Sequence, residues 1–202
     1  MSWQLFYPFF SLENTALSEW CRERLPMVYG TMAPTATFWK GWTMTRILFV
    51  CHGNICRSVA AQYIFQNIIN IRKIEDRFLV DSAATSTEEI GSPVYPPMEH
   101  ALRQSGVPIG NHRARKLQKS DYSKYDLIIG MDEENAYYMR RILGDDPENK
   151  VHYLMEYAGQ PDKRIDDPWY TRKFDLCVSE ITEGCIGLLE HLAGPTPGQA
   201  PS

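Results

Sequence analysis

The sequence has few cysteines, and they are not closely spaced. Its five cysteines are an odd number: Cys21, Cys51, Cys56, Cys177 and Cys185. Small secreted proteins held together by disulfides have dense and usually paired cysteines. The sequence therefore argues against a disulfide scaffold and favours a reducing compartment, and we expect a cytoplasmic protein.

Long apolar runs and a strong charge of one sign are also missing. An apolar patch near the N-terminus has no basic residue ahead of it, and Glu13 interrupts it before it reaches the length of a membrane span. We therefore expect neither a signal peptide nor a membrane helix. The 25 acidic and 21 basic residues leave a net charge of −4, which argues against nucleic acid or a membrane surface as a partner.

The two ends of the chain differ from the middle. Residues 1–43 hold four of the five tryptophans and show no sustained strand or helix period apart from a possible short helix at 11–25. We interpret them as an N-terminal extension of uncertain structure. Residues 195–202 are rich in proline and glycine and are predicted to be a disordered tail. Residues 44–194 are predicted to form one domain.

Within this domain, short apolar runs alternate with longer amphipathic segments. We predict strands at 46–51, 77–85, 126–132 and 150–157, and helices at 58–70, 92–107, 134–144 and 174–194. Ser58 stands at an N-cap position, and Ala60, Ile64, Ile68 and Ile71 form an apolar stripe. This alternation predicts an α/β fold with a four-stranded parallel sheet and helices on both faces.

The first predicted strand runs directly into the stretch "CHGNICRS", residues 51–58. Ligands of parallel α/β proteins bind beyond the carboxyl ends of the strands, which places Cys51 well for chemistry. Gly53 and Asn54 tolerate positive φ angles, so the loop can turn its backbone N–H groups inward around an anion. The positive N-terminal end of the next helix adds to this. The same features would stabilise a Cys51 thiolate and make it a nucleophile.

Arg57 and Ser58 extend this interpretation. The planar guanidinium of Arg57 matches two phosphate oxygens, and the Ser58 hydroxyl can donate to the sulfur of Cys51. Other interpretations are a buried core cysteine, half of a zinc site, or a disulfide between Cys51 and Cys56. The zinc site lacks a second Cys/His pair at ligand spacing. The full residue set at one junction favours the nucleophile.

The loop resembles the C-x-G-N-x-C-R-S motif of the low-molecular-weight protein tyrosine phosphatases, and the resemblance covers about residues 44–194. It implies hydrolysis of a tyrosine-phosphorylated protein through a cysteinyl-phosphate intermediate, with no metal and no other cofactor. It also implies that Cys51 and Arg57 are catalytic. The expected substrate-binding residues of this loop are His52, Gly53, Asn54, Ile55, Cys56 and Ser58.

A phosphatase of this kind needs a proton donor for the departing phenolate. The candidate is Asp167 in "IDDPWY", where Pro168 stiffens the loop and Trp169 and Tyr170 could flank an aromatic leaving group. Taken alone, the stretch is typical of a plain Asp-Pro turn. Because it resembles the acid loop of the family, we predict Asp167, and not its neighbour Asp166, as the catalytic acid.

The resemblance implies roles for two further residues. His112 would order Asn54 through hydrogen bonds, although a surface histidine in a basic patch is the alternative. Cys56 would capture an oxidised Cys51 as a disulfide. From position alone, Asp132 is interpreted as a loop or helix-start carboxylate. Cys177 and Cys185, which lie two helical turns apart, are expected in the core.

The sequence also departs from the family pattern. The loop "TSTEEIGSP", residues 85–93, carries Glu88 and Glu89 where the family often has an aromatic wall. Ile55 stands where the protein-arginine phosphatases of the family have threonine, which favours phosphotyrosine. A thioredoxin-coupled arsenate reductase is an alternative, but it needs a further cysteine pair and residues 126–150 contain no cysteine. An inactive phosphoprotein-binding module is a second alternative, although nucleophile, arginine and acid are all present.

Overall fold

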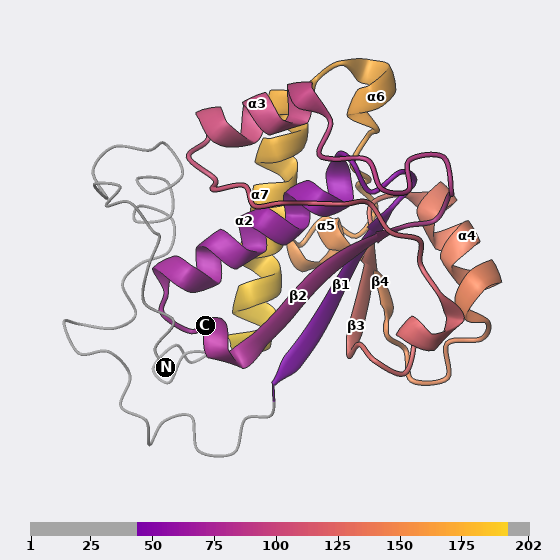
Figure 1. Ribbon diagram of the computed structural model, residues 1–202. Helices are drawn as coiled ribbons and strands as arrows, with labels where there is room; N and C mark the ends of the chain where they lie inside the picture. The colour runs from indigo at the N-terminus through magenta and orange to yellow at the C-terminus, as the bar shows by residue number, and fades with distance from the viewer. Residues whose placement is uncertain (1–43, 194–202) are drawn as a thin grey trace, which may run out of the picture.

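The structure is a computed structural model that describes residues 44–193. The predictions for residues 1–43, with their possible helix, and for the tail at 195–202 lie outside this range. The described chain forms a four-stranded parallel sheet with helices on both faces (Figure 1), which confirms the predicted fold class. None of the helices between residues 44 and 193 has the length and apolarity that crossing a bilayer requires.

Strands and helices alternate along the chain, as the sequence predicts. The strands are β1 (Thr45–Cys51), β2 (Phe78–Ala84), β3 (Leu127–Gly130) and β4 (Val151–Tyr153). The helices are α2 (Arg57–Ile71), α3 (Pro96–Gln104), α4 (Glu133–Leu143), α5 (Leu154–Tyr157), α6 (Pro168–Thr171) and α7 (Phe174–Ala193). Two 3-10 turns, η1 (Glu75–Arg77) and η2 (Lys119–Asp121), precede β2 and β3.

Strand β1 is apolar and buried from Ile47 to Cys51 because this part is covered on both faces. Ile47 and Phe49 pack into the core formed with α2 and α7, whereas Leu48 and Val50 pack into the core on the side of α4. All four side chains are fully buried. Burial of side chains of this size contributes about 1.5–3 kcal/mol each, so the strand is rigidly held up to Cys51.

The order of the strands places the end of β1 at a special point of the sheet. The order is β2-β1-β3-β4, so the chain leaves β1 toward β2 on one side and places β3 on the other. Ligands of open parallel sheets bind in the crevice at such a switch in strand order. The loop of residues 52–56 therefore lies where this architecture holds its ligands.

Three details of the prediction are wrong. Ile71 is 42% exposed, because it is the last residue of α2 and lies beyond the part of the helix that packs into the core. The fourth strand ends at Tyr153, and the residues after it form α5, which packs against α7. Ser58 does not cap α2, because the helix begins at Arg57 and the Ser58 side chain makes other contacts.

Candidate active site

Asn54 shapes the loop that follows β1. Its φ of 58° lies in the left-handed region, as its residue type predicts, and its side chain is fully buried. The side-chain nitrogen donates to the hydroxyls of Ser58 (2.9 Å) and Ser82 (2.8 Å), and Oδ1 accepts from the backbone N–H of Arg115 (3.0 Å). The amide therefore ties the loop to α2, to β2 and to the segment before η2.

His112 supports the same loop from outside. Its Nε2 lies 2.7 Å from the carbonyl oxygen of Asn54. Because a carbonyl oxygen only accepts, Nε2 carries the hydrogen and donates it. Burial lowers the pKa of His112 below its ordinary value, which favours the neutral ring. The contact with Asn54 that the resemblance implies is therefore present, and His112 is partly buried.

Cys51 is the last residue of β1, and the residue is 2% exposed. Its Sγ is 3.0 Å from the hydroxyl oxygen of Ser58. Since that oxygen already accepts a hydrogen bond from Asn54, the hydroxyl hydrogen is available to the sulfur. The geometry thus favours donation from Ser58 to Cys51, which stabilises a negatively charged sulfur.

The guanidinium of Arg57 is buried, with 1% of the residue exposed. Nη1 donates to Asp132 and to the carbonyl oxygen of Ile165 (3.2 Å), and Nη2 donates to Asp167. Burial opposes the charged form, but Cys51, Asp167 and Asp132 together raise the pKa of Arg57 above its ordinary value. Arg57 is therefore a permanent cation at this site.

The third nitrogen of the Arg57 guanidinium is Nε. Within residues 44–193 its buried Nε has no hydrogen-bond partner. A buried donor without a partner costs about 1–3 kcal/mol, and such donors are rare in folded proteins. Together with the loop backbone, Nε forms a place where an oxyanion would complete the hydrogen bonding.

Asp167 reaches this place from the loop before α6. It is the N-cap of α6: Oδ1 accepts from the backbone N–H of Trp169 (2.9 Å), and Oδ2 accepts from Arg57. Pro168 occupies the first helical position, which suits its fixed φ. Asp166 is exposed, so the structure brings Asp167, and not its neighbour, to the arginine.

Asp132 has a larger role than its sequence position indicated. It is the N-cap of α4, accepting from the backbone N–H of Asn135 (2.7 Å), which confirms the predicted helix start. Sequence reasoning missed its ion pair with Arg57. The available signal was its position directly after β3, a strand that pairs with β1.

An aromatic pair lies beside Asp167. The ring of Trp169 is 4.9 Å from the ring of Tyr95, and the backbone N–H of Tyr95 donates to the carbonyl oxygen of Ile55 (2.9 Å). Sequence reasoning missed Tyr95, which stands two residues beyond the stretch where an aromatic wall was sought. Tyr170 is 80% exposed. Trp169 and Tyr95 thus join the acid loop to the loop after β1.

The glutamates of residues 85–93 lie over the same loop. His52 Nε2 is 3.2 Å from Glu88 Oε2, in an ion pair when the histidine is protonated. The side chain of Glu89 approaches Gly53, where an added Cβ would lie 3.4 Å from Glu89 Cγ. His52 and Gly53 therefore contribute to the rim of the site.

Within residues 44–193, the cysteines other than Cys51 are buried thiols. Burial and the neighbouring Cys51 raise the pKa of Cys56, and burial raises the pKa of Cys177 and Cys185. Cys177 and Cys185 belong to the core, as predicted. The four cysteines of the described chain are free. Between residues 44 and 193, no group of three His, Cys, Asp or Glu side chains is placed to hold a metal ion.

The fold and this loop define a parallel α/β domain with a cysteine- and arginine-containing turn at its switch point. Residues 46–196 match the sequence model of the family described as "Low molecular weight phosphotyrosine protein phosphatase". The chain therefore belongs to this family, which is a family of hydrolases.

Known relatives agree with the family match. A low molecular weight phosphotyrosine protein phosphatase of Gallus gallus is 35% identical over 148 residues, which cover 71% of this chain and 93% of the relative. The low molecular weight protein-tyrosine-phosphatase YfkJ of Bacillus subtilis is 33% identical over 150 residues, covering 74% of this chain and 96% of the relative. The crystal structure of YfkJ superposes with a TM-score of 0.72 and covers 75% of this chain and 96% of its own, at 32% identity.

Proposed function

We propose that this protein hydrolyses phosphotyrosine in tyrosine-phosphorylated proteins through a cysteinyl-phosphate intermediate. One observation carries the proposal. Around a single loop lie the Cys51 sulfur, 3.0 Å from the Ser58 hydroxyl, and the buried Arg57 guanidinium, which holds Asp167 and whose Nε has no partner among residues 44–193. These are a nucleophile, a phosphate-binding cation and an acid on one site.

Substrate binding follows from the contacts of Arg57. The phosphoryl oxygens accept hydrogen bonds from the N–H groups of residues 52–57 and from Nε and Nη2 of Arg57. The phosphate takes Nη2 from Asp167, which frees this carboxyl group beside the leaving oxygen. Because two negative charges repel each other, the bound phosphate favours the protonated form of Asp167. Asp132 keeps Arg57 in place through Nη1.

The first chemical step forms a covalent bond to the enzyme. The Cys51 thiolate attacks phosphorus in line, so that an S–P bond forms while the P–O bond to the tyrosyl oxygen breaks. Asp167 gives its proton to that oxygen, and tyrosine leaves. Arg57 and the loop N–H groups stabilise the charge on the three other oxygens in the transition state.

The second step releases phosphate. A water molecule attacks phosphorus, the Asp167 carboxylate takes a proton from it, and the S–P bond breaks. The Ser58 hydroxyl stabilises the departing thiolate of Cys51, from which it lies 3.0 Å. Enzyme and acid thereby return to their starting protonation states.

The preference for phosphotyrosine rests on the surroundings of this loop. Trp169 and Tyr95 form an aromatic surface beside Asp167, which suits a phenolic leaving group. Ile55 places an apolar side chain in the loop and is buried. Cys56, Gly53 and His52 complete the loop that receives the phosphate. A cytoplasmic location, with no nucleic-acid or membrane partner, stays a prediction.

Hydrolysis of p-nitrophenyl phosphate and of a phosphotyrosine peptide, both with a chelator present, tests the proposal. We expect Cys51→Ser to lose at least about 10³-fold in kcat, because no covalent step remains. Asp167→Asn should lose about 10²- to 10⁴-fold on the peptide, whose leaving group needs the proton. The matched control Asp166→Asn should retain activity. Full activity in Cys51→Ser would overturn the proposal, and loss of wild-type activity with chelator would reopen the question of a metal.

A further inference from the structure

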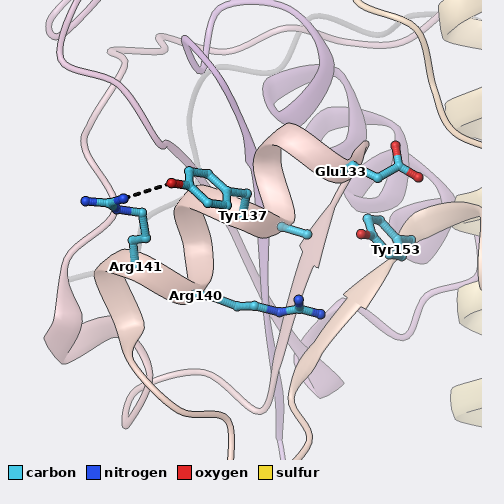
Figure 2. Close-up of a pocket in the computed structure, with 6 residues that line it drawn as sticks. Glu133, Tyr137, Arg140, Arg141 and Tyr153 are labelled. Carbon is cyan, nitrogen blue, oxygen red and sulfur yellow. Dashed lines mark hydrogen bonds between the residues drawn. The ribbon is translucent and has the colours of Figure 1, made fainter.

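A second hollow lies on α4, outside the site described above (Figure 2). It is a cavity of about 430 Å³ between α4 and the end of β4. Its lining residues are Glu133, Ala136, Tyr137, Arg140, Arg141 and Tyr153. This volume lies within the range of roughly 300–1,000 Å³ that is usual for ligand pockets. None of these residues takes part in the proposed reaction.

The hollow carries uncompensated positive charge. Arg140 makes no side-chain hydrogen bond or ion pair within residues 44–193, and Arg141 donates to the Tyr137 hydroxyl (2.8 Å) and to no carboxylate of that range. Glu133, the carboxylate of the lining, is paired with Arg164 at 2.7 Å. In a chain of net charge −4, an arginine such as Arg140, which has no carboxylate partner within residues 44–193, suits an anionic ligand.

The hollow also offers an aromatic face. Tyr153 is partly buried at the end of β4, and the guanidinium of Arg164 lies 3.7 Å from its ring centroid, which holds the ring in place. Figure 2 shows Glu133 and Arg140 extending from α4 on the side of Tyr153, with the Tyr137–Arg141 pair on the other side. A ligand that combines an aromatic ring with a doubly charged anion matches Tyr153 and Arg140 together.

We propose that this hollow binds a second phosphotyrosine side chain of the same substrate chain. The inference rests on the proposed function, because the first phosphotyrosine occupies the Cys51 loop. The two sites are linked by α4: its N-cap Asp132 pairs with Arg57 of the first site, and Arg140 of the hollow stands eight residues further along the helix, a rise of about 12 Å. An extended peptide, at about 3.3 Å per residue, spans such a distance with a few residues.

Steady-state kinetics on paired peptides test this. Each peptide carries one phosphotyrosine and, four residues away, either tyrosine or non-hydrolysable phosphonomethyl-phenylalanine. We expect the phosphonate to lower KM roughly tenfold in the wild type, the gain that about 1.4 kcal/mol of charge-assisted hydrogen bonding gives. Arg140→Gln should remove this gain without changing kcat on p-nitrophenyl phosphate. The control Arg103→Gln, in the last turn of α3, should keep it.

Equal KM values for the two peptides in the wild type would overturn the inference, as would an equal loss in Arg103→Gln. NMR separates this failure from failure of the proposed function. Free phosphotyrosine added to the Cys51→Ser protein should shift amide signals both at 52–57 and at 136–141. Shifts at 52–57 alone would refute the second site and leave the proposed function standing. Shifts at 136–141 alone would refute the proposed function and support an anion site on α4.

Discussion

Asp167 accepts a hydrogen bond from Nη2 of Arg57, although 110 residues separate the two in the chain. On the other side of the same guanidinium, Asp132 accepts from Nη1. Arg57 is thereby held between the loop after β3 and the loop before α6. This arrangement holds the guanidinium in place, and in the proposed mechanism the substrate phosphate displaces one of the two carboxylates.

Asp132 has two roles that substitutions can separate. Asp132→Asn keeps the helix cap at Asn135 but removes the charge next to Arg57, so we expect kcat on p-nitrophenyl phosphate to fall roughly tenfold with little change in stability. Asp132→Ala should lose the same activity and also about 1 kcal/mol of unfolding free energy, because the cap is gone. Enzyme kinetics and urea unfolding measure the two effects. Full activity in Asp132→Asn would show that Asp132 only caps α4.

The aromatic pair beside Asp167 should contribute to substrate binding. We expect Trp169→Ala to raise KM for a phosphotyrosine peptide about fivefold, because the Trp169 ring, which packs against Tyr95 at a tilt of 55°, offers the substrate a fixed surface. Tyr170→Ala should change KM by no more than about twofold, since this highly exposed ring has no such support. Steady-state kinetics on the same peptide compare the two. An equal effect of both substitutions would contradict a role of the Trp169–Tyr95 pair in substrate binding.

Cys56 should protect Cys51 from irreversible oxidation. Its raised pKa keeps it a neutral thiol, so peroxide should react first at Cys51, and Cys56 should then close a disulfide with the oxidised sulfur. After peroxide treatment, dithiothreitol should restore most wild-type activity but little activity of Cys56→Ser. Cys185→Ser is the control, because its thiol is fully buried and its hydrogen-bond contact is the carbonyl oxygen of Ala61. Equal recovery in wild type and Cys56→Ser would exclude this role.

The lowered pKa of His112 predicts that the unfolding free energy of the protein depends on pH. Because its pKa in the folded protein is below the ordinary 6.5, the unfolded chain takes up the proton more readily as pH falls. The contribution of His112 is therefore fully present above about pH 6.5 and is lost as pH falls toward the folded-state pKa. Urea unfolding between pH 7.5 and 5 should show the wild type losing stability relative to His112→Gln. His100→Gln is the control. If the unfolding free energies of His112→Gln and of the wild type change in parallel with pH, the prediction is contradicted.

The packing of α7 on α5 should be intolerant of a single methyl group. An added Cβ at Gly187 would lie 2.0 Å from the carbonyl oxygen of Tyr157, so backbone atoms must move. We expect Gly187→Ala to lower the unfolding free energy by about 3 kcal/mol. The control is Gly110→Ala, where an added Cβ meets the side chain of Tyr63 at 3.5 Å, an ordinary contact, and should change the unfolding free energy by less than about 1 kcal/mol. Equal losses of unfolding free energy, measured by urea unfolding, would show that α5 moves to accommodate the added methyl group at little cost.

Local patterns predicted most of the fold. The run of apolar residues in β1 and the apolar spacing of α7 were visible because burial on one or two faces imposes a period on the sequence. The predicted ends of helices and strands were wrong where tertiary packing overrode that period. The segment 150–157 is apolar enough for a strand throughout, but contact with α7 makes its second half the helix α5. Ile71 continues the helical period beyond the surface that α7 covers.

The sequence by itself determined the loop after β1. Cys51, Asn54 and Arg57 lie within one turn of chain, and their φ preferences, charge and spacing act locally, so an eight-residue stretch was enough to predict an anion-binding turn. The positions of Asp167 near the last helix and of the core cysteines were predictable in the same way.

Only the tertiary structure decided which distant groups meet this loop. The parallel order β2-β1-β3-β4 brings the carboxyl ends of the strands to one edge, so Asp132 and Asp167 reach opposite sides of Arg57 and Tyr95 reaches Trp169. No local preference encodes these pairings, because a carboxylate at the start of a helix satisfies its own backbone equally well in any fold. The partners of the arginine were set by how the strands are ordered in space.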